Sequence, residues 1–473
     1  MTSETEARSG YTLPPPSGPL REIAVGWLWL GLIALLVSGI FVVLVVASRT
    51  PYVQELIPWK DFFHTAIVVH VDLSVLVWFL AFAGVLWSHN ARPHWLNLSR
   101  SALGLAGAGT LVVAAAPFFG AKGALMSNYV VILQDPLFFL GLGLLGLGFS
   151  LLILHTLMAA RPVGIRATGE GVLRFGLHAA LVTSALSVGA FIWSYLAIPG
   201  YFGGKELYEL LFWGGGHTLQ YTHILLMLVA WLWLGALSGL DEAIPPRAGL
   251  VVITLGLLPA LGTPFVYLAF PIESPEHREA LTWLMQAGGG LAALPLALAL
   301  LWGWRATPRG PLPEGAPAAR SALVASVGLF GAGGLIGFLI ADSDVTVPAH
   351  YHGSIVAVTL AFMGLTYQLL PRFGLGTAPR RLAILQPALY GAGQLLHVLG
   401  LTWSGLNGVQ RKTAGARQGL DTFSEIAGMA LMGLGGLVAI VGGVLFLVVV
   451  LMAVRHRASG SEEAPEHLEH QQG

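Results

Sequence analysis

The sequence predicts an all-α integral membrane protein with twelve transmembrane helices and both termini in the cytoplasm. Three observations predict this fold class: the composition, the number of long apolar runs, and the distribution of Lys and Arg. Hydrophobic residues make up 55% of the 473 residues and charged residues only 10%, against roughly 25% in a soluble domain. The mean hydropathy is +0.74, and Lys+Arg and Asp+Glu are both 24. This composition excludes a water-soluble enzyme, a disordered chain and a nucleic-acid binder.

Twelve apolar runs are long enough to cross a bilayer, because a helix needs about 20 residues to span roughly 30 Å of hydrocarbon. The predicted spans are 23–48, 66–88, 101–119, 129–158, 176–199, 213–238, 248–270, 279–304, 321–341, 350–370, 382–404 and 426–453. They divide the chain into a cytoplasmic N-terminal segment at 1–22, a membrane domain at 23–455 and a cytoplasmic tail at 456–473. We expect the tail, rich in Glu, His and Gln, to be disordered.

The basic residues orient the bundle, since loops rich in Lys and Arg stay in the cytoplasm. Of the 24 Lys and Arg, only eight fall in one set of alternate loops: Arg49, Lys60, Lys122, Lys205, Arg278, Arg411, Lys412 and Arg417. The other 16 fall at the chain ends and in the loops on their side. We therefore expect both termini inside, in the cytoplasmic membrane of a prokaryote and surrounded by lipid.

Histidine is the strongest nitrogen ligand available, because the chain has fifteen histidines and no cysteine. The lack of cysteine excludes disulfides, zinc–thiolate sites, iron–sulfur clusters and thioether-linked haem. Four histidines fall at the outer third of three predicted spans: His70 in the second, His217 in the sixth, and His350 and His352 in the tenth. One alone would be an interfacial histidine bonded to a neighbouring carbonyl. Four at matching depth indicate a site.

The spacing of these histidines favours a large planar cofactor over a small ion. At about 100° per residue, His350 and His352 project about 200° apart and point to opposite faces of one helix. Each can hold a different haem, whose iron takes an axial imidazole and whose ring fills apolar space between helices. His217 and Tyr221 are four residues apart and share a face. His223 points elsewhere, and we expect it to pack or to form a hydrogen bond.

Arg411 and Lys412 lie in the outer loop before the last predicted span, above the histidine layer. Haem propionates are carboxylates and need donors of this kind. Ordinary anchoring at the membrane interface is the alternative reading of the pair.

These residues resemble catalytic subunit I of the haem-copper oxidase superfamily, which includes cytochrome oxidases and nitric oxide reductases. The resemblance covers about 20–455, and its tenth-helix motif His-x-His reads Ala-His-Tyr-His at 349–352. It implies that His350 is the proximal ligand of a high-spin haem. It also implies that His352 and His70 are the axial ligands of a low-spin haem, with His64 a weaker candidate than His70.

Trp-Gly-Gly-Gly-His at 213–217, followed by Tyr221, is similar to the family's sixth-helix element. That element carries one ligand of the distal metal and, in many oxygen reductases, a tyrosine that supplies an electron and a proton. Arg411 and Lys412 match the family's propionate-binding pair in position, although the usual Pro-Arg-Arg reads Val-Gln-Arg-Lys here.

The distal copper or non-haem iron departs from the family pattern. The family holds that metal with three histidines, two of them adjacent in the seventh helix. The corresponding stretch, 263–270, is Thr-Pro-Phe-Val-Tyr-Leu-Ala-Phe, without a histidine. His217 alone does not retain such a metal. The side chains left to complete an unusual site are Gln220, Tyr221, His223 and His277. The resemblance therefore implies two haems and puts the distal metal in doubt.

The resemblance implies a respiratory redox subunit. Electrons would come from a periplasmic cytochrome c or cupredoxin-like subunit II, and the high-spin haem would reduce O2 or NO. The eighth predicted span, 279–304, lacks the lysine that pumping oxidases of this fold often carry, so we expect no proton pumping. The missing histidine pair favours NO, whereas Tyr221 favours O2. The alternative is a non-catalytic haem protein, an electron conduit, gas sensor or assembly partner, that has lost the distal metal. A transporter using intramembrane histidines would bind no haem.

Overall fold

The predicted all-α membrane fold with twelve spans is confirmed. The computed structural model describes residues 10–53, 62–163, 167–240, 243–306 and 315–462. Twelve helical segments in these ranges are long and apolar enough to cross a membrane.

The first six spans are α1 (Pro19–Arg49), α2, η3 and α3 (Phe63–Val71, Asp72–Val77, Trp78–His89), α4 and η4 (Leu96–Ala115, Ala116–Phe119), α5 (Pro136–Ala159), α6 (Gly169–Ala197) and α7 (Gly204–Leu237). The last six are α8, η5 and α9 (Pro246–Leu257, Leu258–Gly262, Thr263–Ala269), α10 (Pro275–Ala306), α11 (Ala316–Gly337), α12 (Thr346–Arg372), α13 (Arg380–Gly405) and α14 (Phe423–Glu462). Strands β1 (Ala124–Leu125) and β2 (Ile132–Leu133) form an antiparallel hairpin, and η6 (Gly415–Gln418) lies in the last loop.

Several predicted boundaries are wrong. The fifth span begins at Gly169 rather than at 176, and the sixth at Gly204 rather than at 213. The fourth span begins at Pro136 rather than at 129, because the Asp135 carboxylate accepts a hydrogen bond from the Leu137 N–H (2.9 Å) and caps the helix, with proline at its first position. The apolar residues before it form β2 instead. At the other end, α14 continues to Glu462, so the predicted tail begins as helix. Residues 463–473 of that tail lie outside the described residues.

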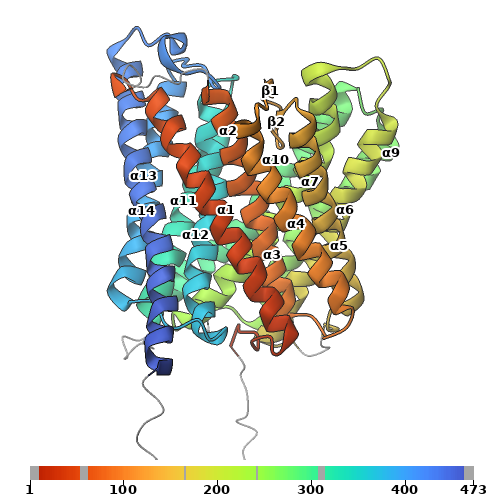
Figure 1. Ribbon diagram of the computed structural model, residues 1–473, viewed down its shortest axis with the longest axis vertical. Coiled ribbons are helices and arrows are strands. Elements are labelled where there is room, and N and C mark those ends of the chain that lie inside the picture. Colours follow the sequence, from red (N-terminus) through yellow and green to blue (C-terminus); the bar gives the residue numbers. More distant parts are fainter. Residues whose placement is uncertain (1–9, 54–61, 164–166, 241–242, 307–314, 463–473) are drawn as a thin grey trace, which may run out of the picture.

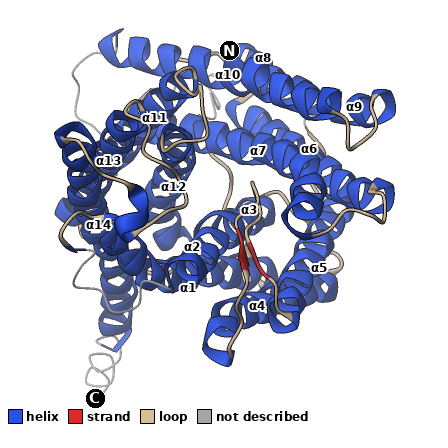
Figure 2. Cartoon of the chain, turned by 90° about the horizontal axis from the view of Figure 1, so that it is seen from above, coloured by secondary structure: helices blue, strands red, loops and turns tan. Residues whose placement is uncertain are grey.

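Three spans form the centre of the bundle, and they carry the candidate histidines. In the most apolar 18-residue windows of Gly204–Leu237, Thr346–Arg372 and Phe63–His89, 94%, 83% and 67% of residues are buried. In the other nine spans the share is half or less. Seen from above, α3, α7 and α12 are enclosed by the remaining helices (Figure 2). Most residues in the central part of these three spans are therefore packed against protein rather than lipid.

Helix α1 begins, and helix α14 ends, at the end of the bundle opposite the β1–β2 hairpin (Figure 1). The segment before α1 is held beneath this end. Tyr11 is buried and donates a hydrogen bond from its hydroxyl to the Ile244 carbonyl (2.7 Å), and Arg372 donates to the Leu13 carbonyl (3.2 Å). Assignment of this end to the cytoplasm remains a prediction from the basic residues.

Candidate functional site

Helix α12 directs its two histidines toward different neighbours. The Nδ1 atom of His350 lies 2.7 Å from the Gly333 carbonyl oxygen of α11. A Cβ atom on Gly337, one turn further along α11, would lie 2.8 Å from the same nitrogen. The glycines thus form a notch that receives the His350 ring. The His352 ring instead lies 5.1 Å from the His397 ring of α13.

His70 lies on α2, immediately before a π-helical segment, Asp72–Val77. Its Nδ1 atom is 2.8 Å from the Ser38 hydroxyl oxygen of α1, and its ring interacts electrostatically with His352. Helix α2 therefore brings His70 to the face of α12 that carries His352. His64 is engaged elsewhere, since its Nε2 atom is 3.1 Å from the Lys412 carbonyl oxygen.

The three predicted haem ligands share one hydrogen-bonding arrangement. Nδ1 of His70, His350 and His352 is bonded within the protein, to Ser38, Gly333 and the Pro348 carbonyl respectively. No described residue provides a hydrogen-bond partner for the three Nε2 atoms, and each ring keeps some exposure. A ligating imidazole requires this arrangement, with one nitrogen fixed and the other open. These residues therefore fit an axial role toward haem iron.

The candidate distal residue His217 has both ring nitrogens occupied. Its Nδ1 atom lies 2.9 Å from the Trp213 carbonyl oxygen and its Nε2 atom 2.9 Å from the Tyr129 hydroxyl. Tyr129 lies in the loop between β1 and β2 with a φ of 68°, a left-handed conformation that is uncommon for a non-glycine residue. Burial and then the nearby Glu209 carboxylate raise the pKa of Tyr129, so its hydroxyl stays protonated and can donate to His217.

The three glycines before His217 allow aromatic rings to approach α7 on three sides. A Cβ atom on Gly214, Gly215 or Gly216 would overlap Tyr267 of α9, Phe191 of α6 or the Tyr129 ring, respectively. Because successive residues of a helix point about 100° apart, one ring reaches each face. The Gly-Gly-Gly sequence is therefore required by packing around the site.

We expect Gly216→Ala to destabilise the protein, because its Cβ would enter the Tyr129 ring. Overpacking of this kind costs about 1–3 kcal/mol. The measurement is the thermal unfolding midpoint of the purified protein. Gly189→Ala is the matched control, since a Cβ on that outward-facing glycine of α6 meets nothing within 4 Å. Equal midpoints for the two variants would contradict this account of the Gly-Gly-Gly sequence.

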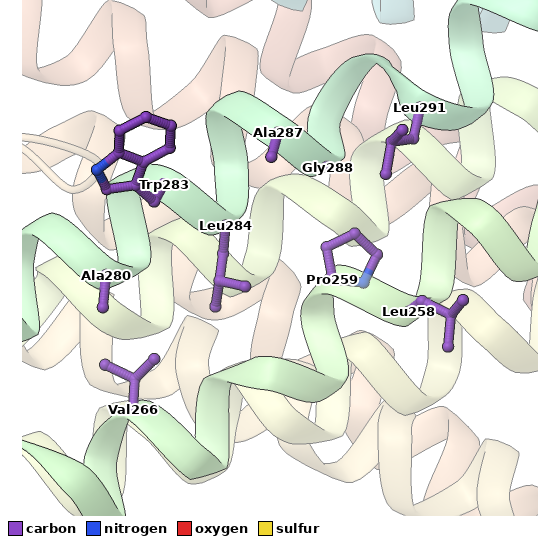
Figure 3. A pocket seen from close by; sticks show the side chains of 9 residues that line it. All are labelled: Leu258, Pro259, Val266, Ala280, Trp283, Leu284, Ala287, Gly288 and Leu291. Atoms are coloured by element: carbon purple, nitrogen blue, oxygen red, sulfur yellow. The ribbon is translucent and has the colours of Figure 1, made fainter.

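Tyr221 shares α7 with His217, as predicted, but its hydroxyl points toward the seventh and eighth spans. The oxygen is buried without a hydrogen-bond partner and lies 3.1 Å from the position a Cβ on Gly288 would take, beside Pro259. Behind these two residues an apolar pocket of about 600 Å³ is open between η5, α9 and α10 (Figure 3). A small apolar molecule in that pocket would be separated from Tyr221 by only Pro259 and Gly288.

The chain is similar in sequence to bacterial proteins that include one named oxidase subunit. An uncharacterised protein of Aquifex aeolicus is 31% identical over 353 residues, 74% of this chain and 84% of that protein. An uncharacterised protein of Rickettsia prowazekii is 27% identical over 491 residues, 90% of this chain and 95% of that protein. Cytochrome c oxidase subunit 1 of Thermus thermophilus is 25% identical over 517 residues, 94% of this chain and 87% of that protein. No protein-family model matches the chain.

The structural comparison agrees with this similarity. A haem-copper terminal oxidase, determined by cryo-EM as a dimer, superposes with a TM-score of 0.70 at 17% identity, over 93% of this chain and 84% of that one. This chain is a divergent haem-copper oxidase subunit I-like protein. It is a multi-pass membrane protein, and it belongs to one family with the Aquifex aeolicus protein.

In the part of the chain that the structure describes, the subunit I-like protein offers no set of ligands for a distal metal. Among the residues that the structure describes, no group of three or more His, Asp or Glu side chains could hold a metal ion. Tyr267 stands in the seventh span and hydrogen-bonds to Ser194 (2.7 Å), while His217 is bonded to Tyr129. His223 does not provide a further ligand for the distal metal. It packs on Phe79, with 4.7 Å between ring centroids, and neither ring nitrogen has a hydrogen-bond partner among the described residues, so its ring is not oriented as a ligand. The residues present do not fit a three-ligand copper or iron site.

Lys412, one of the two predicted propionate donors, is fixed at the end of the oxidase-like bundle that carries the β1–β2 hairpin. Its ammonium group donates to the Met126 carbonyl, and its backbone adopts a left-handed φ of 61°. Burial and then the adjacent Arg411 guanidinium lower the pKa of Lys412 to about 8. The pair therefore concentrates positive charge beside the loop that carries Tyr129.

Three residues of this region were missed by the sequence analysis. His397 contacts the His352 ring. Arg49 is buried, hydrogen-bonds to Gln418 (3.2 Å) and interacts electrostatically with His352. Tyr129 was assigned to a helix. A signal existed for His397, because it lies in the predicted eleventh span at a depth close to that of His352. Arg49 was counted only as a charge at the end of the first span.

Proposed function

We propose that this protein is a haem-bearing redox subunit of a respiratory membrane chain. His70 and His352 would be the axial ligands of a low-spin haem, and His350 would be the proximal ligand of a high-spin haem. The observation that carries the proposal is the set of three imidazoles with Nδ1 fixed and Nε2 open. A haem held by these residues would supply one-electron chemistry and the capacity to bind a diatomic gas, O2 or NO.

The side chains around these histidines have separate tasks in the proposal. Arg411, Lys412 and the buried Arg49 supply positive charge for haem propionates. Tyr129 and Tyr221 supply hydroxyl donors on the α7 side, where His217 holds the Tyr129 oxygen in place. Electrons would come from a periplasmic partner, a cytochrome c or a cupredoxin-like subunit II.

We expect the protein to reduce the gas without pumping protons. Span α10 has no lysine between Pro275 and Ala306. At the end of the bundle predicted to face the cytoplasm, Tyr11 and Leu13 are buried beneath the helices. Neither feature favours a proton pathway rising from that side.

The Tyr129–His217 pair favours a second candidate. Because His217 Nε2 is occupied by a hydroxyl, the chain would bind two haems without a distal metal. In that case it would serve as an electron conduit, a gas sensor or an assembly partner. This candidate predicts gas binding or electron transfer without reduction of the gas.

Visible spectra, metal analysis and gas consumption on one purified sample separate the candidates. We expect a Soret band and two irons per chain. Consumption of O2 or NO with an artificial donor would support the enzyme. Two haems without any turnover would favour the non-catalytic candidate, and a colourless, well-folded preparation would contradict both.

A further inference from the structure

A groove opens on the outside of the bundle between α11 and α13, beside the end of α10. It encloses about 480 Å³, and α11 and α13 pack against each other at the periphery of the bundle (Figure 2). All but two of its lining residues are apolar, the exceptions being Arg320 and Ser321. Val324 and Leu395 are exposed on its two walls. Because these helices are membrane spans, the groove faces the lipid.

Small residues on both helices hollow out the groove. A Cβ atom on Gly391 of α13 would lie 2.8 Å from the Cβ of Ala325 on α11, so the two helices touch at the floor. The Ser321 hydroxyl joins them again by donating to the Ile384 carbonyl (2.7 Å). Gly328 instead faces open space, since a Cβ there would meet nothing within 4 Å. The packing of α11 against α13 therefore builds the hollow.

The groove has the length of one leaflet of the membrane. On α11 its lining extends from Pro317, the second residue of the helix, to Leu329. At 1.5 Å per residue this distance is about 18 Å, close to half of the roughly 30 Å hydrocarbon core. Beyond it, the exposed side chains Leu335 and Phe338 of α11 do not line the groove. A transmembrane helix of a partner would lie along both leaflets, whereas a lipid chain occupies only one.

Arg320 marks the end of the groove that lies near the membrane surface. Its Nε and Nη2 atoms donate to the carbonyl of Ser238, the residue that follows the last turn of α7 (3.1 and 2.8 Å). Its guanidinium carbon is 5.5 Å from the centroid of the Trp304 ring. No described residue provides a hydrogen-bond partner for the third nitrogen, Nη1. Arg320 is thus held in place with one donor group left for a ligand.

The helices around this mouth carry positive charge and no nearby carboxylate. Neither α11 nor α13 contains Asp or Glu, and the acidic residues of α10 lie in its first turns, at the hairpin end. Arg305 is exposed near the end of α10, and Arg380 and Arg381 are exposed at the start of α13. Arg381 lies two turns before the lining residue Ala388, on the same face of α13. The charge therefore fits an anionic headgroup above an apolar chain.

We propose that this groove binds one anionic phospholipid from the leaflet opposite the β1–β2 hairpin. One acyl chain would lie over Gly328 between α11 and α13, and the phosphate would accept hydrogen bonds from Arg320 Nη1 and from Arg381. Basic pockets between membrane spans bind anionic lipid headgroups in this way. The inference does not depend on haem binding. A purely structural role, in which Arg320 only caps the end of α7, is the outcome that the test must separate from it.

The test titrates the full-length protein in detergent with dioleoylphosphatidylglycerol or dioleoylphosphatidylcholine, which share their chains and differ in headgroup charge. Native mass spectrometry counts the bound lipids. We expect one phosphatidylglycerol to bind the wild type at least fivefold more tightly than phosphatidylcholine. Arg320→Gln and Arg381→Gln should each weaken phosphatidylglycerol binding about fivefold, the contribution of one basic residue near a membrane surface. Arg100→Gln is the matched control, because this exposed arginine of α4 lies outside the groove.

A second pair of variants tests the place of the acyl chain. Gly328→Leu puts a side chain into the open groove, and we expect it to weaken the binding of phosphatidylglycerol by about tenfold or more through the lost contacts of a few methylene groups. Gly331→Leu is the matched control, since Gly331 is an exposed glycine of the same helix with equal space around it but does not line the groove. The thermal unfolding midpoint checks that both variants are folded.

Three results would overturn the proposal. Equal affinity of the wild type for the two lipids would remove the role of the arginines. Equal phosphatidylglycerol binding by Gly328→Leu and Gly331→Leu would place the lipid elsewhere. A wild type that is dimeric in detergent and becomes monomeric in Gly328→Leu, with the lipid count unchanged, would assign the groove to a second copy of the chain. If Arg320→Gln fails to fold because the end of α7 loses its partner, Arg381→Gln still decides, since no described residue bonds to the Arg381 side chain.

Discussion

Replacing His350 with alanine is expected to remove the high-spin haem signal and to leave the low-spin signal intact. The His350 ring is held in the Gly333–Gly337 notch of α11, whereas His352 bonds to its own helix and faces α13. Because the two rings pack against different helices, deletion of one ring should not disturb the other. The lost group is the only protein ligand proposed for the high-spin iron, so the loss should be complete rather than graded.

The measurement is the reduced-minus-oxidised spectrum of the purified variant, with carbon monoxide binding as a second report on the high-spin haem. Gel filtration checks that the variant is folded. His155→Ala is the matched control, because this buried histidine of α5 bonds to the His94 carbonyl (3.2 Å), away from the proposed ligands. Disappearance of both haems from a well-folded His350→Ala protein would argue that one haem depends on both histidines.

Hydropathy alone was sufficient to predict the twelve spans, because each crossing must satisfy its own backbone hydrogen bonds in a run of about 20 apolar residues. Boundaries were less certain where apolar residues lie outside a helix. The stretch Tyr129–Leu133 is apolar, yet its backbone forms a turn and β2, and the Asp135 cap decides where α5 begins. Composition does not distinguish these outcomes.

The positions of the candidate histidines followed from helical arithmetic, since residues two apart on one helix must diverge. The hydrogen-bond partners of these histidines could not be predicted in this way. Ser38, Gly333 and Tyr129 lie 32, 17 and 88 residues from the histidines they contact, and such pairs depend on how helices pack. The same holds for His397, whose proximity to His352 arises from the packing of α12 against α13.

Replacing His70 with alanine is expected to abolish the low-spin spectrum selectively. Its Nδ1 atom is fixed by the Ser38 hydroxyl, which would leave Nε2 to hold the proposed low-spin haem together with His352. Ser38→Ala provides a graded comparison. It removes the hydroxyl but keeps the ligand and the Ser38 carbonyl oxygen, which lies 3.3 Å from Nδ1. Loss of a whole orienting partner weakens metal binding by about 10- to 100-fold, so we expect a loss at or below the lower end of that range. The reduced-minus-oxidised spectrum and haem content per chain report both effects.

Two other histidines determine how an unexpected result for His70→Ala would be read. His64 would have to release the Lys412 carbonyl (3.1 Å) before it could bind iron. His397 is the nearer rival, since its ring lies 5.1 Å from that of His352 and its Nδ1 atom is already fixed by the Met432 carbonyl (3.0 Å). His397→Ala alone should therefore keep both haem signals if His70 is the ligand. A low-spin spectrum that survives His70→Ala but vanishes in the His70→Ala, His397→Ala double variant would transfer the axial role to α13.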